Sequence, residues 1–142
     1  MGNMYFEVPG EPQGKARARM GNGRSYTPQK TVLYENLIKT CFLAEENKQT
    51  FFNKEPVVMA ITAYYSIPKS TTKKDRERMI NNELFPTKKP DADNIAKVVC
   101  DALNGVAYYD DTQVVNLMIK KKYTQFEPRL TIMLGPYDGY PF

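Results

Sequence analysis

One segment of the 142-residue chain predicts an amphipathic helix more clearly than any other. Apolar residues recur every three to four positions in this segment, at Ile95, Val98, Val99, Ala102, Leu103 and Val106. This spacing places them on one helical face, which has to be buried against a second layer. The polar residues of the segment lie on the opposite face, and they are Asn94, Lys97, Asp101 and Asn104. Asn104-Gly105 is a typical helix stop.

Strand patterns flank this helix on both sides. Apolar and polar residues alternate from Met4 to Val8, which predicts a strand. The run from Val57 to Ile67 is rich in β-branched and aromatic residues, and we expect a central strand buried on both faces. Residues 114–123 and 129–134 predict two more strands, joined as a hairpin through Glu127-Pro128.

The remaining elements complete an α+β pattern. Thr27-Pro28 is expected to supply the N-cap and first residue of another helix. The apolar face of this helix carries Tyr34, Leu37, Ile38, Cys41 and Phe42. Residues 73–82 predict a short surface helix. The order β-α-β-(α)-α-β-β predicts an α+β fold, a small mixed sheet of about four strands with helices packed on one face. The length favours one domain over residues 1–142.

The composition excludes several classes of protein. The chain has no histidine, which removes Ser-His triads, histidine–metal nucleases and zinc protease motifs. Two distant cysteines, Cys41 and Cys100, do not make a zinc site alone, and we expect both to be reduced core residues. No run approaches the ~18 apolar residues of a membrane span, and the first residues lack a signal core. We therefore expect a cytoplasmic protein.

Acidic residues stand on both sides of the amphipathic helix. Asp91 and Asp93 precede it, and Asp110-Asp111 follow it. Carboxylates at this spacing suit a hard cation such as Mg²⁺. The alternative is structural, because aspartates cap helices, Asp93 and Lys97 have salt-bridge spacing, and an acidic pair suits a turn. A helix of ~12 residues is about 18 Å long, so the sequence leaves open whether Asp111 reaches the first two acids.

Basic residues surround these acids in a chain of net charge +4. Residues 15–30 contain five basic residues and no acid, and other basic runs flank the acidic motif. Such runs are often solvated surface, but several around one acidic cluster favour a footprint for the phosphate backbone. The candidate nucleic-acid-binding residues are Lys15, Arg17, Arg19, Arg24, Lys69, Lys73, Lys74, Lys88 and Lys89.

Three stretches carry a resemblance to a known family. They are Lys89-Pro-Asp-Ala-Asp-Asn-Ile-Ala-Lys97, Asp101-Ala-Leu-Asn-Gly105 and Asp110-Asp-Thr-Gln-Val114. Together they resemble the RusA family of Holliday-junction resolvases. Four more stretches are similar to the version common in Gram-positive bacteria and their phages, namely residues 14–19, 26–28, 67–69 and 86–90. The chain departs from the expected pattern at Ala16 and Ala18, where glycine and proline are expected.

The resemblance implies a Mg²⁺-dependent endonuclease that works as a homodimer on four-way DNA junctions in recombination and repair. It implies no small-molecule substrate and no membrane partner. The family's catalytic acids correspond to Asp91, Asp93 and Asp111, which would hold the metal, and its catalytic lysine corresponds to Lys97. We expect Asp101 to be a surface partner of Lys97. The alternatives are a non-catalytic junction- or DNA-binding protein and a broader branched-DNA nuclease. A nucleotide phosphohydrolase is disfavoured because the chain has no glycine-rich P-loop.

Overall fold

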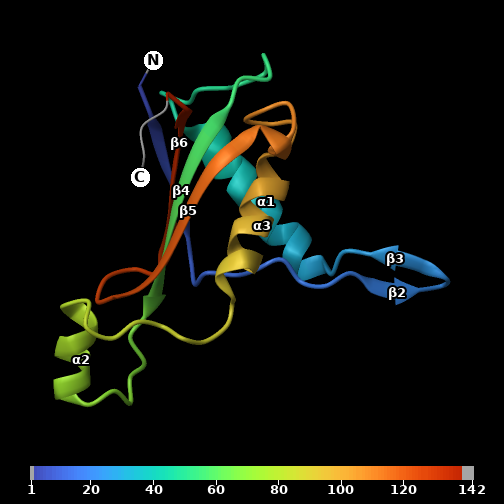
Figure 1. Ribbon diagram of the computed structural model, residues 1–142. Helices are drawn as coiled ribbons and strands as arrows, with labels where there is room; N and C mark the ends of the chain where they lie inside the picture. Colours follow the sequence, from blue (N-terminus) through green and yellow to red (C-terminus); the bar gives the residue numbers. More distant parts are fainter. Residues whose placement is uncertain (1, 139–142) are drawn as a thin grey trace.

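The computed structural model describes residues 2–138 and has the predicted α+β architecture (Figure 1). In chain order, its elements are β1 (Met4–Pro9), β2 (Arg19–Gly21), β3 (Arg24–Tyr26), α1 (Gln29–Ala44), β4 (Val57–Ser66), α2 (Lys73–Ile80), α3 (Ala92–Leu103), the 3₁₀ turn η1 (Asp111–Gln113), β5 (Val114–Thr124) and β6 (Arg129–Pro136). The element order agrees with the prediction. The short β2–β3 hairpin lies within the basic segment of residues 15–30.

The main sheet has four strands in the order β1-β6-β4-β5. Strand β6 is antiparallel to both of its neighbours, whereas β4 and β5 are parallel. The register of the parallel pair runs from Val57 opposite Val114 to Ser66 opposite Thr124, with an irregularity after Val57. The sheet is therefore mixed, as expected.

The predicted hairpin between the last two strands is wrong. Strands β5 and β6 are separated by β4, although only four residues connect them. Burial explains the order, because β6 carries the buried residues Leu130, Ile132, Met133 and Leu134 and suits an inner position. Strand β5 carries Lys120, Lys121 and Lys122, and charged side chains are typical of edge strands.

Helices α1 and α3 pack on one face of the sheet, while α2 lies beyond one end of it (Figure 1). The side chains of β4 that face the helices are buried, and they are Val57, Met59, Ile61, Ala63 and Tyr65. The alternate side chains of β4 are mostly only half-buried. The expectation of a strand buried on both faces is therefore wrong, because no helix among residues 2–138 covers the second face.

The two long helices follow their predicted apolar stripes. Buried side chains of α3 are Ile95, Ala96, Val98, Val99, Ala102 and Leu103, and those of α1 are Thr31, Tyr34, Ile38 and Phe42. Helix α1 begins one residue later than predicted, with Pro28 at the N-cap and no side-chain cap. Both cysteines are free and half-buried. Within residues 2–138, no helix has the length and apolar character needed to cross a membrane.

We expect Ile61→Ala to lower the free energy of unfolding by about 2–5 kcal/mol, the usual cost of a cavity in a packed core. The side chain of Ile61 is only 1% exposed and lies between the sheet and the helices. The neighbouring Thr62→Ala is the matched control, since Thr62 faces the half-exposed side of the same strand. Urea unfolding of both variants measures the difference, and equal losses would contradict this assignment of the core.

Candidate active site

Helix α3 presents its predicted functional residues to solvent. Its buried stripe packs on the sheet, so Asp91, Asp93 and Lys97 are on the exposed side. Asp91 occupies the N-cap position, but its side chain makes no capping hydrogen bond. None of these three side chains forms an ion pair within the described chain. The capping and salt-bridge roles considered above are therefore not observed for Asp91 or for the Asp93–Lys97 pair.

The segment that leads into α3 is held by two side chains of the sheet. The Tyr65 hydroxyl donates to the carbonyl of Pro90 at 2.9 Å, and Lys121 Nζ donates to the carbonyl of Lys88 at 2.7 Å. Lys121 Nζ also lies 5.4 Å from the centroid of the Tyr65 ring, which is cation–π range. These contacts hold the backbone directly before Asp91. Sequence reasoning missed both side chains, because nothing local to β4 or β5 indicates what their ends touch.

Burial gives Tyr65 a stable donor role. Desolvation first, and then the negative charges of Glu11 and Asp91, raise the pKa of Tyr65 to about 12. The phenol is therefore protonated at neutral pH and donates its hydrogen to the Pro90 carbonyl.

The acidic pair after α3 divides into one structural and one free carboxylate. Asp110 accepts hydrogen bonds from the Thr112 amide at 3.1 Å and the Thr112 hydroxyl at 2.5 Å, which hold the pKa of Asp110 below its usual value. Gln113 completes a capping box, because its side-chain oxygen accepts a hydrogen bond from the Asp110 amide at 3.0 Å. Its amide nitrogen donates to the carbonyls of Phe51 and Glu55 at 2.8 and 3.0 Å. Asp110 thus shapes the turn that presents Asp111.

A sequence signal existed for this turn. An acid followed three residues later by glutamine is a capping-box pattern, and Asp110 and Gln113 have that spacing. The buried bonds of Gln113 to residues 51 and 55 had no such signal, because they join segments about 60 positions apart.

Asp111 lies toward the far end of α3 from Asp91. Val114, three residues after Asp111, pairs with Val57 at the start of β4, whereas Tyr65 near the end of β4 bonds the Pro90 carbonyl beside Asp91. Burial first, and the Asp111 charge second, raise the pKa of Cys100 to about 11. Positions 93, 97 and 100 share one helical stripe, and seven residues of helix span about 10 Å. Among residues 2–138, no three acidic, cysteine or histidine side chains are grouped to hold one metal ion. The donors suit a hard cation, but residues 2–138 of a single chain do not gather all three.

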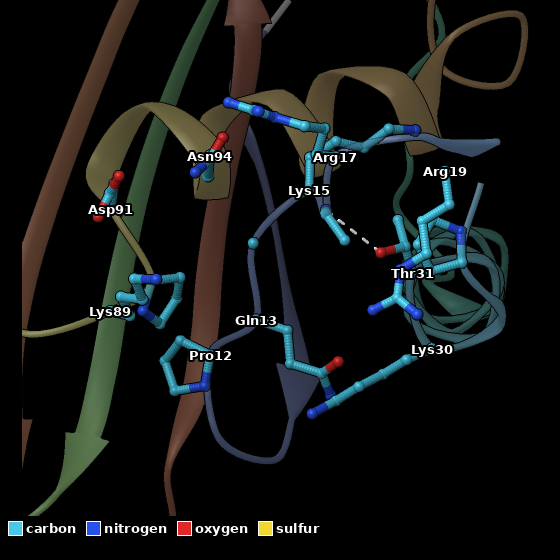
Figure 2. A pocket seen from close by; sticks show the side chains of 14 residues that line it. Pro12, Gln13, Lys15, Arg17, Arg19, Lys30, Thr31, Lys89, Asp91 and Asn94 are labelled. Atoms are coloured by element: carbon cyan, nitrogen blue, oxygen red, sulfur yellow. Dashed lines mark hydrogen bonds between the residues drawn. The ribbon is translucent and has the colours of Figure 1, made fainter. Parts of the chain in front are cut away.

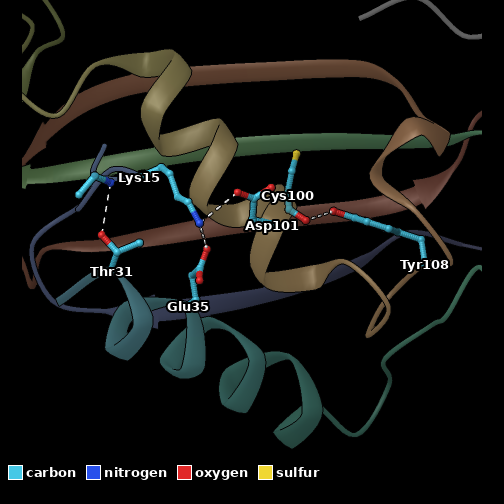
Figure 3. A network of polar contacts seen from close by, with 7 residues as sticks. Lys15, Thr31, Glu35, Cys100, Asp101 and Tyr108 are labelled. Atoms are coloured by element: carbon cyan, nitrogen blue, oxygen red, sulfur yellow. Dashed lines mark hydrogen bonds and ion pairs between the residues drawn. The ribbon is translucent and has the colours of Figure 1, made fainter. Parts of the chain in front are cut away.

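The half-buried side chain of Lys15 forms ion pairs within the fold. Its ammonium group contacts Glu35 of α1 at 2.8 Å and Asp101 of α3 at 3.3 Å (Figure 3). Its backbone amide donates to the carbonyl of Asn94 at 2.9 Å. Burial alone would lower the pKa of Lys15, but its hydrogen bonds to the two acids and their charges raise it. Asp101 therefore pairs with Lys15, and the expected Asp101–Lys97 pair is wrong.

Several other candidate cations line a groove beside Asp91. The groove has a volume of about 530 Å³ and lies between the root of the hairpin, the start of α1 and the start of α3 (Figure 2). Its charged and polar lining includes Arg17, Arg19, Lys30, Lys89, Asp91 and Asn94. A cationic groove with a carboxylate at its edge fits a polyanionic strand passing an acidic site.

The remaining candidate cations are spread over three regions. Arg24 is on the hairpin, and Lys88 lies 6.0 Å from the ring centroids of Tyr65 and Tyr123. Lys69, Lys73 and Lys74 are exposed between the end of β4 and the first turn of α2. The structure therefore brings Arg17, Arg19 and Lys89 to Asp91, while α2 forms a separate basic surface.

The sequence of this chain matches a known class of nuclease. The model of the family described as Endodeoxyribonuclease RusA matches residues 9–135, and the chain belongs to that family. It is also similar to the uncharacterized protein YqaN of Bacillus subtilis (strain 168). The two are 37% identical over 135 residues, which is 91% of this chain and 93% of YqaN. Family membership makes the chain a DNA endonuclease by class.

We expect Lys15→Met to lower the thermal midpoint, because it leaves Glu35 and Asp101 without their shared cation. Lys30→Met is the control, since Lys30 is exposed and forms no ion pair within the described chain. Differential scanning calorimetry compares the two variants with the wild type. A Lys15→Met protein as stable as Lys30→Met would contradict a structural role for this ammonium group.

Proposed function

We propose that this protein is a Mg²⁺-dependent endonuclease that resolves four-way DNA junctions by phosphodiester hydrolysis in recombination and repair, acting as a one-domain homodimer. The observation that carries the proposal is the unpartnered set of carboxylates on the α3 side of the molecule. Asp91, Asp93 and Asp111 make no side-chain hydrogen bond or ion pair within residues 2–138, and Arg17, Arg19 and Lys89 line a groove with Asp91. Unpaired acids beside a basic groove suit a bound metal and a DNA strand.

The donor chemistry fits Mg²⁺, which prefers carboxylate oxygens and water. Asp91, Asp93 and Asp111 would hold it, and when bound it would acidify a water and polarise the phosphate. Lys97 lies one turn after Asp93 and is exposed on the same stripe. Its charge is placed to stabilise the extra negative charge that develops on the phosphate in the transition state.

We propose that the DNA strand runs along the groove lined by Arg17, Arg19, Lys30 and Lys89. These four cations contact the phosphate backbone, and Asp91 at the rim meets the scissile phosphate. Lys15 lines the same groove, and its ammonium group pairs with Glu35 and Asp101, which holds α1 and α3 together. The exposed lysines of α2 form a second basic surface, which would contact another arm of the junction.

The separation of the acids supports a site shared between two protomers. Asp91 and Asp93 begin α3, whereas Asp111 is close to Cys100 near its end. A two-fold axis that places two α3 helices antiparallel would bring Asp111 of each protomer toward the first two acids of the other. Such a pair would also present two sites to the two equivalent strands of a junction.

An exposed apolar edge lies beside Asp111. Val115 is 57% and Leu117 is 43% exposed on the edge strand β5. The apolar face of α1 is buried in the core, and β6 is an inner strand, so neither offers an exposed apolar surface. The β5 edge is therefore the surface that we assign to the dimer.

We expect Asp91→Asn, Asp93→Asn and Asp111→Asn each to abolish Mg²⁺-dependent cleavage of a labelled four-way junction while leaving the fold and junction binding intact. Removing a carboxylate removes a metal ligand and also relieves repulsion with phosphate. Asp110→Asn is the matched control, because an amide oxygen retains the cap to Thr112. A variant of the first group that cleaves at the wild-type rate would remove that residue from the site. Binding without cleavage by the wild type would favour the non-catalytic alternative.

We expect Lys97→Ala to lose cleavage rate by orders of magnitude while junction affinity changes by less than about tenfold, because the lysine acts on charge that develops in the transition state. Single-turnover cleavage and equilibrium binding measure the two effects separately. Equal losses of rate and affinity would instead identify Lys97 as an ordinary contact to the DNA backbone.

We expect a mixture of Asp91→Asn and Asp111→Asn proteins to recover nicking that neither has alone. In a shared-site dimer, the mixed pair contains one site with both changes and one site with neither. If each site lay within one protomer, both sites of the mixed pair would be defective. Co-refolded mixtures on a cruciform plasmid distinguish these arrangements, with singly nicked circles as the expected product. No recovery, with mixed dimers verified by mass spectrometry, would contradict the shared site.

A further inference from the structure

The β2–β3 hairpin extends away from the layers of the fold (Figure 1). Its two strands pack chiefly against each other, and residues 16–26 are exposed except for half-buried Gly21. Asn22 and Gly23 have φ values of 51° and 74°, the left-handed conformations that a tight two-residue hairpin turn requires. The arm is therefore ordered by its own turn and pairing rather than by the core.

The two faces of this arm differ in chemistry. Arg19 pairs with Tyr26, and Gly21 pairs with Arg24, which puts these four residues on one face. Met20 and Ser25 share the other face, which is uncharged. One face therefore carries two guanidinium groups around an aromatic ring.

Tyr26 lies against the backbone of Gly21. A Cβ atom at Gly21 would be only 2.9 Å from Tyr26 Cε1, so glycine is needed for this close approach. The Tyr26 side chain is nevertheless 50% exposed. One side of the ring is thus covered by the hairpin, and the rest is open to a flat partner.

We propose that this face is a stacking platform for an unstacked base at the branch point of junction DNA, with Tyr26 under the base and Arg19 and Arg24 on the adjoining phosphates. Aromatic rings flanked by cations bind bases whose faces are free, which a continuous duplex does not offer. Arg19 also lines the groove that holds Asp91, so the platform adjoins the acidic site (Figure 2). The choice of junction DNA rests on the proposed function.

Photocrosslinking tests this placement directly. A four-way junction carries 5-iodouracil at its branch point, and the full chain binds it in metal-free buffer so that no cleavage occurs. We expect irradiation to join the DNA to Tyr26 within the tryptic peptide of residues 25–30. A junction with 5-iodouracil in the middle of an arm is the DNA control. Crosslinks at other residues only, or equally from the arm position, would overturn the proposal.

Matched substitutions test the energetics. Tyr26→Ala should weaken junction binding roughly 5- to 100-fold, the usual effect of losing one stacked base. Tyr26→Phe keeps the ring and should bind like the wild type, as should Met20→Ala on the neutral face. All three should bind linear duplex equally. Wild-type junction binding by Tyr26→Ala, or a change in its molar mass by light scattering, would overturn the platform.

The same experiments distinguish a failure of the stacking platform from a failure of the proposed nuclease activity. A wild-type protein that crosslinks through Tyr26 but never cleaves with Mg²⁺ would retain the platform and lose the proposed activity. If the wild type cleaves and Tyr26→Ala binds the junction as tightly as the wild type, the proposed activity would be retained and the platform lost. A wild type that binds no junction would exclude both.

Discussion

The buried face of α3 determines the rest of the site. Six side chains of this twelve-residue helix are buried against the sheet and α1, which fixes the rotation of the helix about its axis. A shift of one residue would turn it by 100° and bring charged side chains into the core at a large cost. Asp91, Asp93 and Lys97 thus point outward because hydrophobic packing leaves them no other direction.

The parallel pairing of β4 and β5 then separates the acids. Parallel neighbours require a connection that returns the chain to the starting end, and α3 spans that return. The start of α3 is tied to the carboxyl end of β4 through Tyr65, and its end leads to the amino end of β5. Residues just before and just after the helix must therefore lie at opposite ends of it. A site that uses Asp111 together with Asp91 would then need a second chain, which is the physical argument for the proposed shared site.

Local patterns in the sequence predicted most elements but not their partners. The apolar stripes of α1 and α3 and the strand runs were readable because burial imposes a period on neighbouring residues. The pairing of β6 between β1 and β4 was missed, since a short connection favours a hairpin and only the burial of the whole strand opposes it. The proposed role of Lys15 in DNA binding followed from a charge run, whereas its contacts to Glu35 and Asp101 join distant segments.

The neighbours Asp110 and Asp111 show why residue type alone cannot assign a role. Both are aspartates in one turn, yet the Asp110 carboxylate accepts two hydrogen bonds from Thr112, and Asp111 accepts none. The difference comes from Gln113, which is buried and ties the turn to the loop before β4. This anchoring fixes Asp110 as the cap and leaves the next carboxylate outside the capping hydrogen bonds. Helix α3 shows the same division of roles, because Asp101 forms an ion pair with Lys15 while Asp91 and Asp93 have no ion pair within residues 2–138. Acids that stabilise the fold and acids that have no partner within residues 2–138 thus stand side by side, and only their contacts distinguish them.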